Sequence, residues 1–325
     1  MTPLGRETDV ALVDRPRPST NKGGSEKEDM STDGQACDHV GNHPNNLLCV
    51  RCGQPLRVIR TVGQYQLLRL LGKGGMGTTF LAWRTPHSPD HDHQPPGQRL
   101  VVVKQLNTDI ALIPKARELF EREAAVLKQV NHVGIPRFLD AFSEQDQAYL
   151  VMELVHGQNL EQFVLKHGSV EVNQAIHWMQ QTCDVLHHLH THYPPILHRD
   201  IKPANLLRQY RDSRIMVVDF GAVKAMAEVM GTCIKAEGYT APEQEAGKPT
   251  IASDLFSVGA TLVFLLTRKT PLSFLISADE MSLAGTTQIP LDLQQVLEKA
   301  LAQNASERYS SALELKLALG ACLEP

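Results

Sequence analysis

The residues that decide the fold are H-R-D-I-K-P-A-N at positions 198–205. Two shorter strings follow in order, D-F-G beginning at Asp219 and A-P-E beginning at Ala241. Acidic, basic and amide side chains stand close together in these strings, as expected of a site that does chemistry on a charged group. Chance would rarely assemble all three in this order, so the interpretation of the chain starts here.

Upstream, G-K-G-G-M-G begins at Gly72. Such a glycine string marks a dinucleotide fold or merely a tight turn. A dinucleotide site needs a helix directly after the glycines, but T-T-F-L-A-W at 78–83 is rich in β-branched and aromatic residues and predicts a strand. We therefore expect a hairpin whose loop consists of Gly72, Lys73, Gly74, Gly75, Met76 and Gly77.

Lys104 ends R-L-V-V-V-K, a strand whose apolar run should be buried, and a buried ammonium must be paired. From Lys115 to Val130 apolar residues recur at helical spacing and predict an amphipathic helix. Glu123 lies on the inward apolar stripe of that helix, so we expect it to pair with Lys104. Glu118 is the alternative partner.

These motifs, in this order, form the protein-kinase pattern. The chain resembles the eukaryotic-type (Hanks-type) serine/threonine protein kinases over roughly residues 60 to 323. The resemblance implies a bilobal α+β fold, with a small β-rich lobe at 60–155 that holds one helix and a larger helical lobe at 156–323. It also implies transfer of the ATP γ-phosphate to Ser or Thr hydroxyls of protein substrates.

The resemblance assigns roles to single residues. Asp200 would orient the substrate hydroxyl and accept its proton, and Lys202 would neutralise charge on the moving phosphoryl group. A lysine at this place is typical of serine/threonine rather than tyrosine kinases. Lys104 would hold the α- and β-phosphates of ATP while Glu123 holds Lys104.

The nucleotide site has three expected parts. The glycine flap matches the loop whose backbone amides lie over the ATP phosphates. The segment M-E-L-V at 152–155 is the expected hinge, where the backbone at Glu153 and Val155 would meet adenine. Asn205 and Asp219 match the magnesium ligands of the family, and their oxygens are the hard ligands that Mg²⁺ takes.

One position departs from the family pattern, because Ala236 stands where Thr or Ser is usual. The missing hydroxyl would bridge Asp200 and Lys202, so a pseudokinase scaffold that binds nucleotide but transfers poorly is the alternative to an enzyme. Thr232 lies 11 residues before Glu243, where many relatives carry an activating phosphate, and is the expected regulatory site. Small-molecule phosphotransferases would not be expected to carry D-F-G and A-P-E.

Two further matches support the fold more than the chemistry. Asp254 resembles the buried aspartate that holds the catalytic loop, and Arg308 resembles the partner of Glu243. The histidine-rich run H-H-L-H-T-H at 187–192 suggests a metal, but it lies where the preceding helix should end. Capping and solvated histidines are the favoured interpretation of that run.

The segment 36–57 holds a second cluster, with C-D-H-V-G-N-H at Cys37 and C-V-R-C-G at Cys49. Thiolates of Cys49 and Cys52 suit adjacent corners of a tetrahedral zinc site, and Cys37 would be a third ligand. His39 or His43 would be the fourth. Such a knuckle ahead of a kinase resembles an arrangement in bacterial members of the family. It would dock a partner protein or steady the small lobe; unligated or redox-active thiols and a zinc-mediated adaptor are the alternatives.

Composition limits the remaining possibilities. Residues 1–35 are rich in Pro, Gly, Ser and charge, which predicts a disordered tail. A net charge of −4 gives no reason to expect nucleic acid or an anionic membrane as the main partner. The charged N-terminus does not resemble a secretion signal, and the apolar run near 255–266 is too short to span a bilayer. We therefore expect a cytoplasmic protein with no transmembrane segment.

Overall fold

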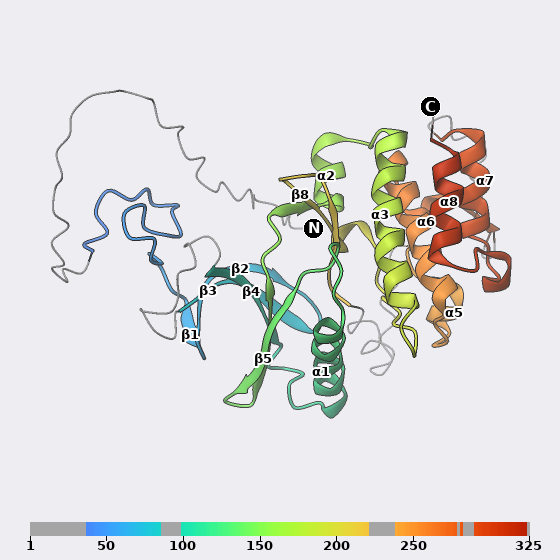
Figure 1. The fold of residues 1–325 in the computed structure, drawn as a ribbon. Coiled ribbons are helices and arrows are strands. Elements are labelled where there is room, and N and C mark those ends of the chain that lie inside the picture. The colour runs from blue at the N-terminus through green and yellow to red at the C-terminus, as the bar shows by residue number, and fades with distance from the viewer. Residues whose placement is uncertain (1–36, 86–98, 221–237, 278–279, 282–288, 324–325) are drawn as a thin grey trace, which may run out of the picture.

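The computed structural model describes residues 37–85, 99–220, 238–277, 280–281 and 289–323. They form two lobes, a curved β-sheet with one long helix beside it and a larger helical part (Figure 1). The bilobal α+β fold predicted from the sequence is confirmed. The predicted tail at 1–35 and the predictions for Thr232 and Ala236 lie outside the described residues.

The small lobe is built on a six-stranded sheet whose neighbouring strands are all antiparallel. The strand order is β1-β2-β3-β4-β6-β5, with β1 at Arg60–Val62, β2 at Tyr65–Lys73, β3 at Gly77–Arg84, β4 at Leu100–Leu106, β5 at Phe138–Glu144 and β6 at Gln147–Glu153. Strand β3 follows the glycines directly and pairs with β2. The segment is a strand, as predicted, and not the helix that a dinucleotide site needs.

The large lobe contains helices packed around α6. Its helices are α2 (Leu160–His167), α3 (Val172–His190), α5 (Pro242–Glu245), α6 (Ile251–Thr267), α7 (Leu291–Ala300) and α8 (Ala312–Ala321). The 3-10 helices are η2 (Pro203–Asn205), η3 (Pro271–Phe274) and η4 (Ala305–Glu307). Short strands lie at β7 (Gly157–Asn159), β8 (Leu206–Gln209), β9 (Ile215–Val217), β10 (Leu275–Ser277) and β11 (Glu280–Met281).

Helix α6 is buried from Ser253 to Thr267, because apolar residues cover all of its faces. A buried helix is what the sequence predicts for this run. Among the helices of the described residues, none has the length and apolar character that crossing a membrane requires.

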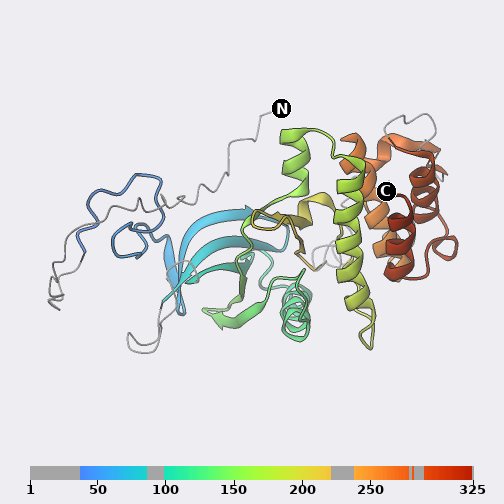
Figure 2. The same cartoon turned by 45° about the horizontal axis from the view of Figure 1, so that its top comes forward.

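Helix α1 (Pro114–Gln129) lies between the sheet and α3 in both views (Figure 1, Figure 2). Proline at its first position has a fixed φ that suits the start of a helix. Glu123 lies on the buried face of α1, as predicted from the apolar spacing. The alternative, Glu118, is exposed and pairs with Lys115 at 2.6 Å.

The loop between α1 and β5 contacts the large lobe. The Gly134 carbonyl accepts a hydrogen bond from Val217 N–H at 2.8 Å, which ties the loop to β9. A Cβ atom on Gly134 would lie 2.6 Å from Val185 Cγ2 on α3 and 3.3 Å from the Ile215 carbonyl oxygen. The loop therefore approaches α3 so closely that only glycine fits.

The N-terminal cysteine segment packs on the small lobe. It forms a tight hairpin in which Leu48 bridges Pro55 and Cys49 N–H donates to the Gln54 carbonyl at 2.8 Å. Leu47 and Leu48 join one apolar cluster with Leu68, Leu81, Trp83, Leu100 and the hinge residue Leu154. This contact places the segment against the sheet and Leu154. In Figure 2 the segment lies on the side of the small lobe that faces away from the helical lobe.

We predict that Gly134→Ala lowers the free energy of unfolding by about 1–3 kcal/mol, because the added methyl overlaps Val185. Urea unfolding followed by circular dichroism measures this. Val133→Ala is the control, since Val133 is exposed and should change stability by less than about 0.5 kcal/mol. Equal midpoints for Gly134→Ala and wild type would show that the loop retreats from α3 without cost.

Candidate active site

A buried lysine joins three elements. Lys104 near the end of β4 lies 2.7 Å from Glu123 Oε1 on α1 and 2.8 Å from Asp219 Oδ1 after β9. Burial opposes the charge of Lys104, but the two carboxylates outweigh burial and raise the pKa of this lysine. The ammonium is therefore charged and fixed between the lobes, and the pairing of Lys104 with Glu123 is the one the sequence predicts.

Asp219 lies at the start of D-F-G with φ at 59°, a conformation that is costly for a residue with a side chain. The Lys104 ammonium holds the pKa of Asp219 below its ordinary range. The next residue, Phe220, is buried with its ring centroid 5.0 Å from that of His198. Phe220 thus anchors the D-F-G string in the core, while the half-exposed Asp219 carboxylate contacts Lys104.

The catalytic-loop residues form a second group beside the first. Lys202 Nζ lies 2.9 Å from Asp200 Oδ2, and Asn205 Nδ2 donates to the same Asp200 oxygen at 2.8 Å. Asn205 Nδ2 also donates to the Asp200 carbonyl at 2.8 Å. Because Asp200 occupies the nitrogen of the Asn205 amide, the oxygen of that amide remains to bind a cation. Val218 N–H donates to the Asn205 carbonyl at 3.0 Å, which places Asp219 beside this group.

Asp254 at the start of α6 holds the catalytic loop from below, as predicted. Its carboxylate accepts from the backbone N–H of His198 at 2.9 Å and of Arg199 at 2.7 Å. Burial alone would raise the pKa of Asp254, but the hydrogen bond from His190 and that from Arg199 outweigh it and lower the pKa. Arg199 has φ at 64°, so the backbone of the loop is strained at the residue whose N–H group Asp254 binds.

Two residues of this support escaped the sequence analysis. His190 Nε2 lies 2.9 Å from Asp254 Oδ2, and Gln244 Nε2 donates to the Arg199 carbonyl at 2.8 Å. The interpretation of the histidine run as capping and solvated is therefore wrong for His190, which is buried. Helical spacing could have indicated that His190 is buried, because it follows Leu186 by four residues on the buried stripe of α3.

The predicted partnership of Arg308 with Glu243 is also present. The guanidinium donates two parallel hydrogen bonds to the carboxylate, at 2.8 and 2.9 Å. Arg308 is buried and also donates to the backbone carbonyls of Ala252, Ala302 and Gln303. The end of the A-P-E string is thus fastened to the loop before α8.

The flap joins β2 to β3, and the hinge follows β6. A Cβ on Gly77 would lie 2.8 Å from the Gln105 carbonyl oxygen and 3.3 Å from Lys104 Cγ, so glycine lets the flap approach β4. Lys73 is exposed, whereas Met76 is buried in the main core. At the hinge, the Glu153 side chain accepts from Arg137 Nε at 3.1 Å and the Glu153 N–H donates to the Arg137 carbonyl at 2.9 Å. Val155 is half-buried.

A family model described as protein kinase domain matches residues 65–317. The chain belongs to the protein kinase domain family. Serine/threonine-protein kinase B of Synechocystis sp. is 36% identical over 301 residues, which cover 87% of this chain and 50% of that protein. Serine/threonine-protein kinase D of the same organism is 32% identical over 284 residues, covering 80% of this chain and 52% of that protein. The chain thus spans about half the length of these curated relatives.

Solved structures agree with this fold. The crystal structure of the Mycobacterium tuberculosis PknI kinase domain matches with a TM-score of 0.65 and 24% identity. The match covers 82% of this chain and 99% of that chain. The family model and the curated relatives confirm the family resemblance inferred from the sequence motifs, and the solved structure confirms the fold.

A candidate metal centre lies ahead of the kinase domain. One ligand atom each of Cys37, His39, Cys49 and Cys52 lies within 4.8 Å of the others. The Cys37 and Cys49 sulfurs are 3.8 Å apart, and Cys52 Sγ lies 3.5 Å from His39 Nε2. His43 is outside this group, so the arrangement favours His39 over His43 as fourth ligand.

Hydrogen bonds prepare the Cys49 thiol to ionise. The backbone of Cys52 contributes most, followed by the Asn42 side chain, which donates to Cys49 Sγ at 3.3 Å, and together they lower the pKa of Cys49 to about 6. A thiolate is the form that binds zinc. Three sulfurs and one imidazole make a donor set that suits tetrahedral zinc.

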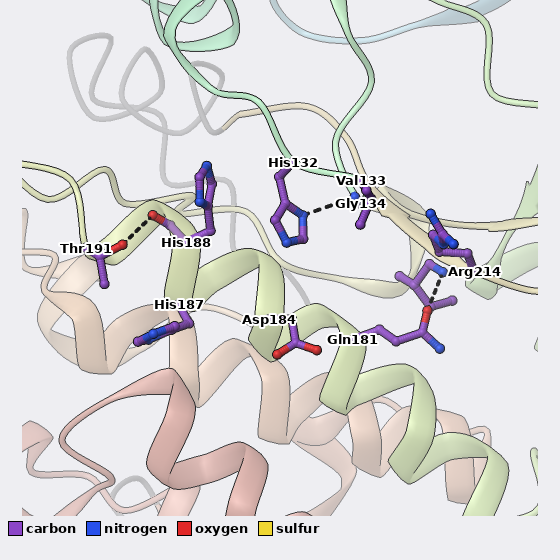
Figure 3. Close-up of a pocket in the computed structure, with 10 residues that line it drawn as sticks. His132, Val133, Gly134, Gln181, Asp184, His187, His188, Thr191 and Arg214 are labelled. Atoms are coloured by element: carbon purple, nitrogen blue, oxygen red, sulfur yellow. Dashed lines mark hydrogen bonds between the residues drawn. The ribbon is translucent and has the colours of Figure 1, made fainter.

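His187 and His188 of the histidine run line a cavity of about 540 Å³ (Figure 3). The ring of His132, in the loop after α1, lies tilted against that of His188 with centroids 5.1 Å apart, and His188 contacts His192 at 5.0 Å. Asp184 and Arg214 line the same cavity. Burial lowers the pKa of His132 and of His188, and the neighbouring imidazoles lower both values further.

We predict that stability falls as the pH drops below about 6.5, because the unfolded chain then binds protons that folded His132 and His188 resist. Above that pH both imidazoles are neutral and this penalty is absent. The double variant His132→Asn, His188→Gln should lose part of the slope, and asparagine can still accept the hydrogen bond from Gly134 N–H. Urea midpoints between about pH 7.5 and 5.5 measure it.

His177→Gln is the matched control, because this exposed histidine on α3 bonds only Gln180 within the described part of the chain. It should keep the wild-type slope. A double variant whose midpoints follow the same pH curve as wild type would refute the role of the two contacting imidazoles.

Proposed function

We propose that this chain is a protein kinase that transfers the γ-phosphate of ATP to Ser or Thr hydroxyls of protein substrates. One observation carries the proposal. The group formed by Asp200, Lys202 and Asn205 lies beside the group formed by Lys104, Glu123 and Asp219, joined through the hydrogen bond from Val218 to Asn205. A base, two cations and two oxygen ligands thus lie close together, as phosphoryl transfer requires.

The residues present fit magnesium. Asp219 offers a carboxylate with a lowered pKa, and Asn205 offers an amide oxygen whose direction is set by the bonds from its nitrogen to Asp200. We infer that these two would hold the ion, which neutralises phosphate charge when bound. Carboxylate and amide oxygens are hard ligands and suit this ion better than zinc.

The remaining roles follow from the contacts. Asp200 would orient the acceptor hydroxyl and accept its proton, while Lys202 at 2.9 Å would offset the charge that develops on the phosphoryl oxygens. Lys104, held by Glu123, would bind the nucleotide phosphates. The flap at 72–77 would cover these phosphates, and the backbone at Glu153 and Val155 would contact adenine.

The lysine bridge and the fixed Asp200 favour an enzyme over a pseudokinase scaffold. A scaffold needs a nucleotide site but has no use for a carboxylate that two donors hold at 2.8 and 2.9 Å. The sequence argument for the scaffold rests on Ala236, which lies outside the described residues. The regulatory role of Thr232 stays a prediction for the same reason.

We predict that Asp200→Asn lowers phosphate transfer to a generic protein substrate by about 100-fold or more, because the amide cannot accept the hydroxyl proton. Asp219→Ala should abolish magnesium-dependent transfer while the fold survives. Radiolabelled ATP measures both. Asp212→Asn is the control, since Asp212 is exposed in a turn and contacts Arg214. Wild-type incorporation in Asp219→Ala would refute the assignment.

We also propose that Cys37, His39, Cys49 and Cys52 bind structural zinc. Thiols stay reduced, and so able to bind metal, in a reducing compartment, which makes the proposal consistent with a cytoplasmic protein. Of the two roles considered for this knuckle, the packing of Leu47 and Leu48 beside Trp83 and Leu154 favours steadying the small lobe over docking a partner. Metal binding would then stabilise the sheet that carries the flap.

We predict that zinc co-purifies at about one atom per chain. Cys49→Ser and His39→Ala should lose it and lower the melting temperature, whereas His43→Ala is the matched control and should keep it. Elemental analysis and thermal unfolding with and without chelator measure the two effects. Metal-free wild-type protein prepared without chelator, or equal loss in His39→Ala and His43→Ala, would contradict the ligand set.

A further inference from the structure

Asn107, one residue past the end of β4, donates hydrogen bonds to the carbonyl groups of the glycine flap. Its side-chain Nδ2 donates to the carbonyl oxygens of Gly74 at 2.8 Å and Gly75 at 3.2 Å. Its backbone N–H donates to the Met76 carbonyl at 2.9 Å. One residue thus binds three consecutive carbonyls at the tip of the flap.

The contact is built into the fold. Thr78 Oγ1 on β3 donates to Asn107 Oδ1 at 2.8 Å, which fixes the amide with its nitrogen toward the flap. The Asn107 side chain is 8% exposed, and Met76 at the tip is 1% exposed within the main core. A polar bond and an apolar anchor therefore hold the same turn.

These bonds decide which backbone groups the flap can offer. The Gly77 carbonyl accepts from Gly74 N–H at 2.9 Å, so all four carbonyls from Gly74 to Gly77 are occupied. Gly75 is exposed, and within the described residues no acceptor takes its N–H group. A backbone N–H without competing carbonyls beside it can bind an anion.

Asn107 also couples the flap to the lysine. It stands three residues after Lys104, and Gly77 pairs with Leu106 in the same ladder. The two groups that would contact phosphate, the Gly75 amide and the Lys104 ammonium, are therefore fixed to one end of one strand. A site for a polyphosphate must hold the separation between these two groups constant.

We propose that Asn107 is a positioning residue for the nucleotide phosphates, which turns the flap carbonyls away and leaves the exposed Gly75 amide to bind the anion. The proposal rests on the proposed kinase function. It predicts an effect on binding that a purely structural asparagine would not have. Loss of the Asn107 amide should weaken binding of the phosphates and leave binding of the adenine end unchanged.

The test compares Mg-ATP with adenosine, which lacks phosphate, by calorimetric titration of the full chain. Asn107→Ala should raise the Kd for Mg-ATP by about 3- to 10-fold, the effect of one or two lost hydrogen bonds, with the Kd for adenosine unchanged. Asn107→Asp keeps the shape but cannot donate to the flap, and should weaken Mg-ATP at least as much. Thr78→Val should act in the same direction with a smaller effect.

Gln147→Ala is the matched control. Gln147 on β6 donates to the Leu106 carbonyl at 3.3 Å, next to Asn107, and among its recorded partners none is in the flap. It should leave both affinities unchanged. In hydrogen exchange, the peptide containing residues 72–77 should exchange faster in Asn107→Ala than in Gln147→Ala.

Two results would overturn the proposal: an unchanged Kd for Mg-ATP in the folded Asn107 variants, or an equal loss of adenosine affinity. Failure of the proposed kinase function has a different signature, because wild type would then bind Mg-ATP without transferring phosphate. The binding comparison therefore tests Asn107 whether or not a substrate protein is phosphorylated.

Discussion

The charge of Lys104 is the constraint on which the arrangement of the lobes depends. A buried ammonium without partners would be costly, and its two carboxylates come from α1 and from the segment after β9. Both elements must therefore stay close to β4 for the charge to be tolerated. The same requirement keeps the lysine beside Asp219, so the stability of the lobe contact and the geometry of the site have a common cause.

A second buried charge organises the large lobe in a similar way. Asp254 is fully buried, and its hydrogen bonds to His198 and Arg199 hold a loop whose backbone is strained. Gln244 holds the other side of the Arg199 peptide through its carbonyl. Strain at a site persists only where the surroundings fix it from several directions. Here α3, α5 and α6 each contribute a residue to that support.

Much of this could be predicted because the signals are local. The motif strings predict the fold, and the apolar spacing in α1 identifies Glu123 over Glu118 as the partner of Lys104. His190 was missed because a histidine in a histidine-rich run resembles a solvated residue, although its spacing from Leu186 places it inward. Asn107 and Gln244 have no local signal, since each binds a backbone carbonyl more than 30 residues away in the chain. Contacts of that kind depend on the tertiary fold alone.

The placement of the aromatic residues has an optical consequence. The chain contains two tryptophans, and the lobes hold one each. Trp83 is buried on β3 in the cluster that Leu47 and Leu48 join, whereas Trp178 is buried in α3 with its ring 5.4 Å from that of Phe163. Intrinsic fluorescence from a variant that retains a single tryptophan would therefore report on one lobe at a time. Trp83 is in addition a natural probe of the knuckle, because loosening of the hairpin would admit water to its indole ring.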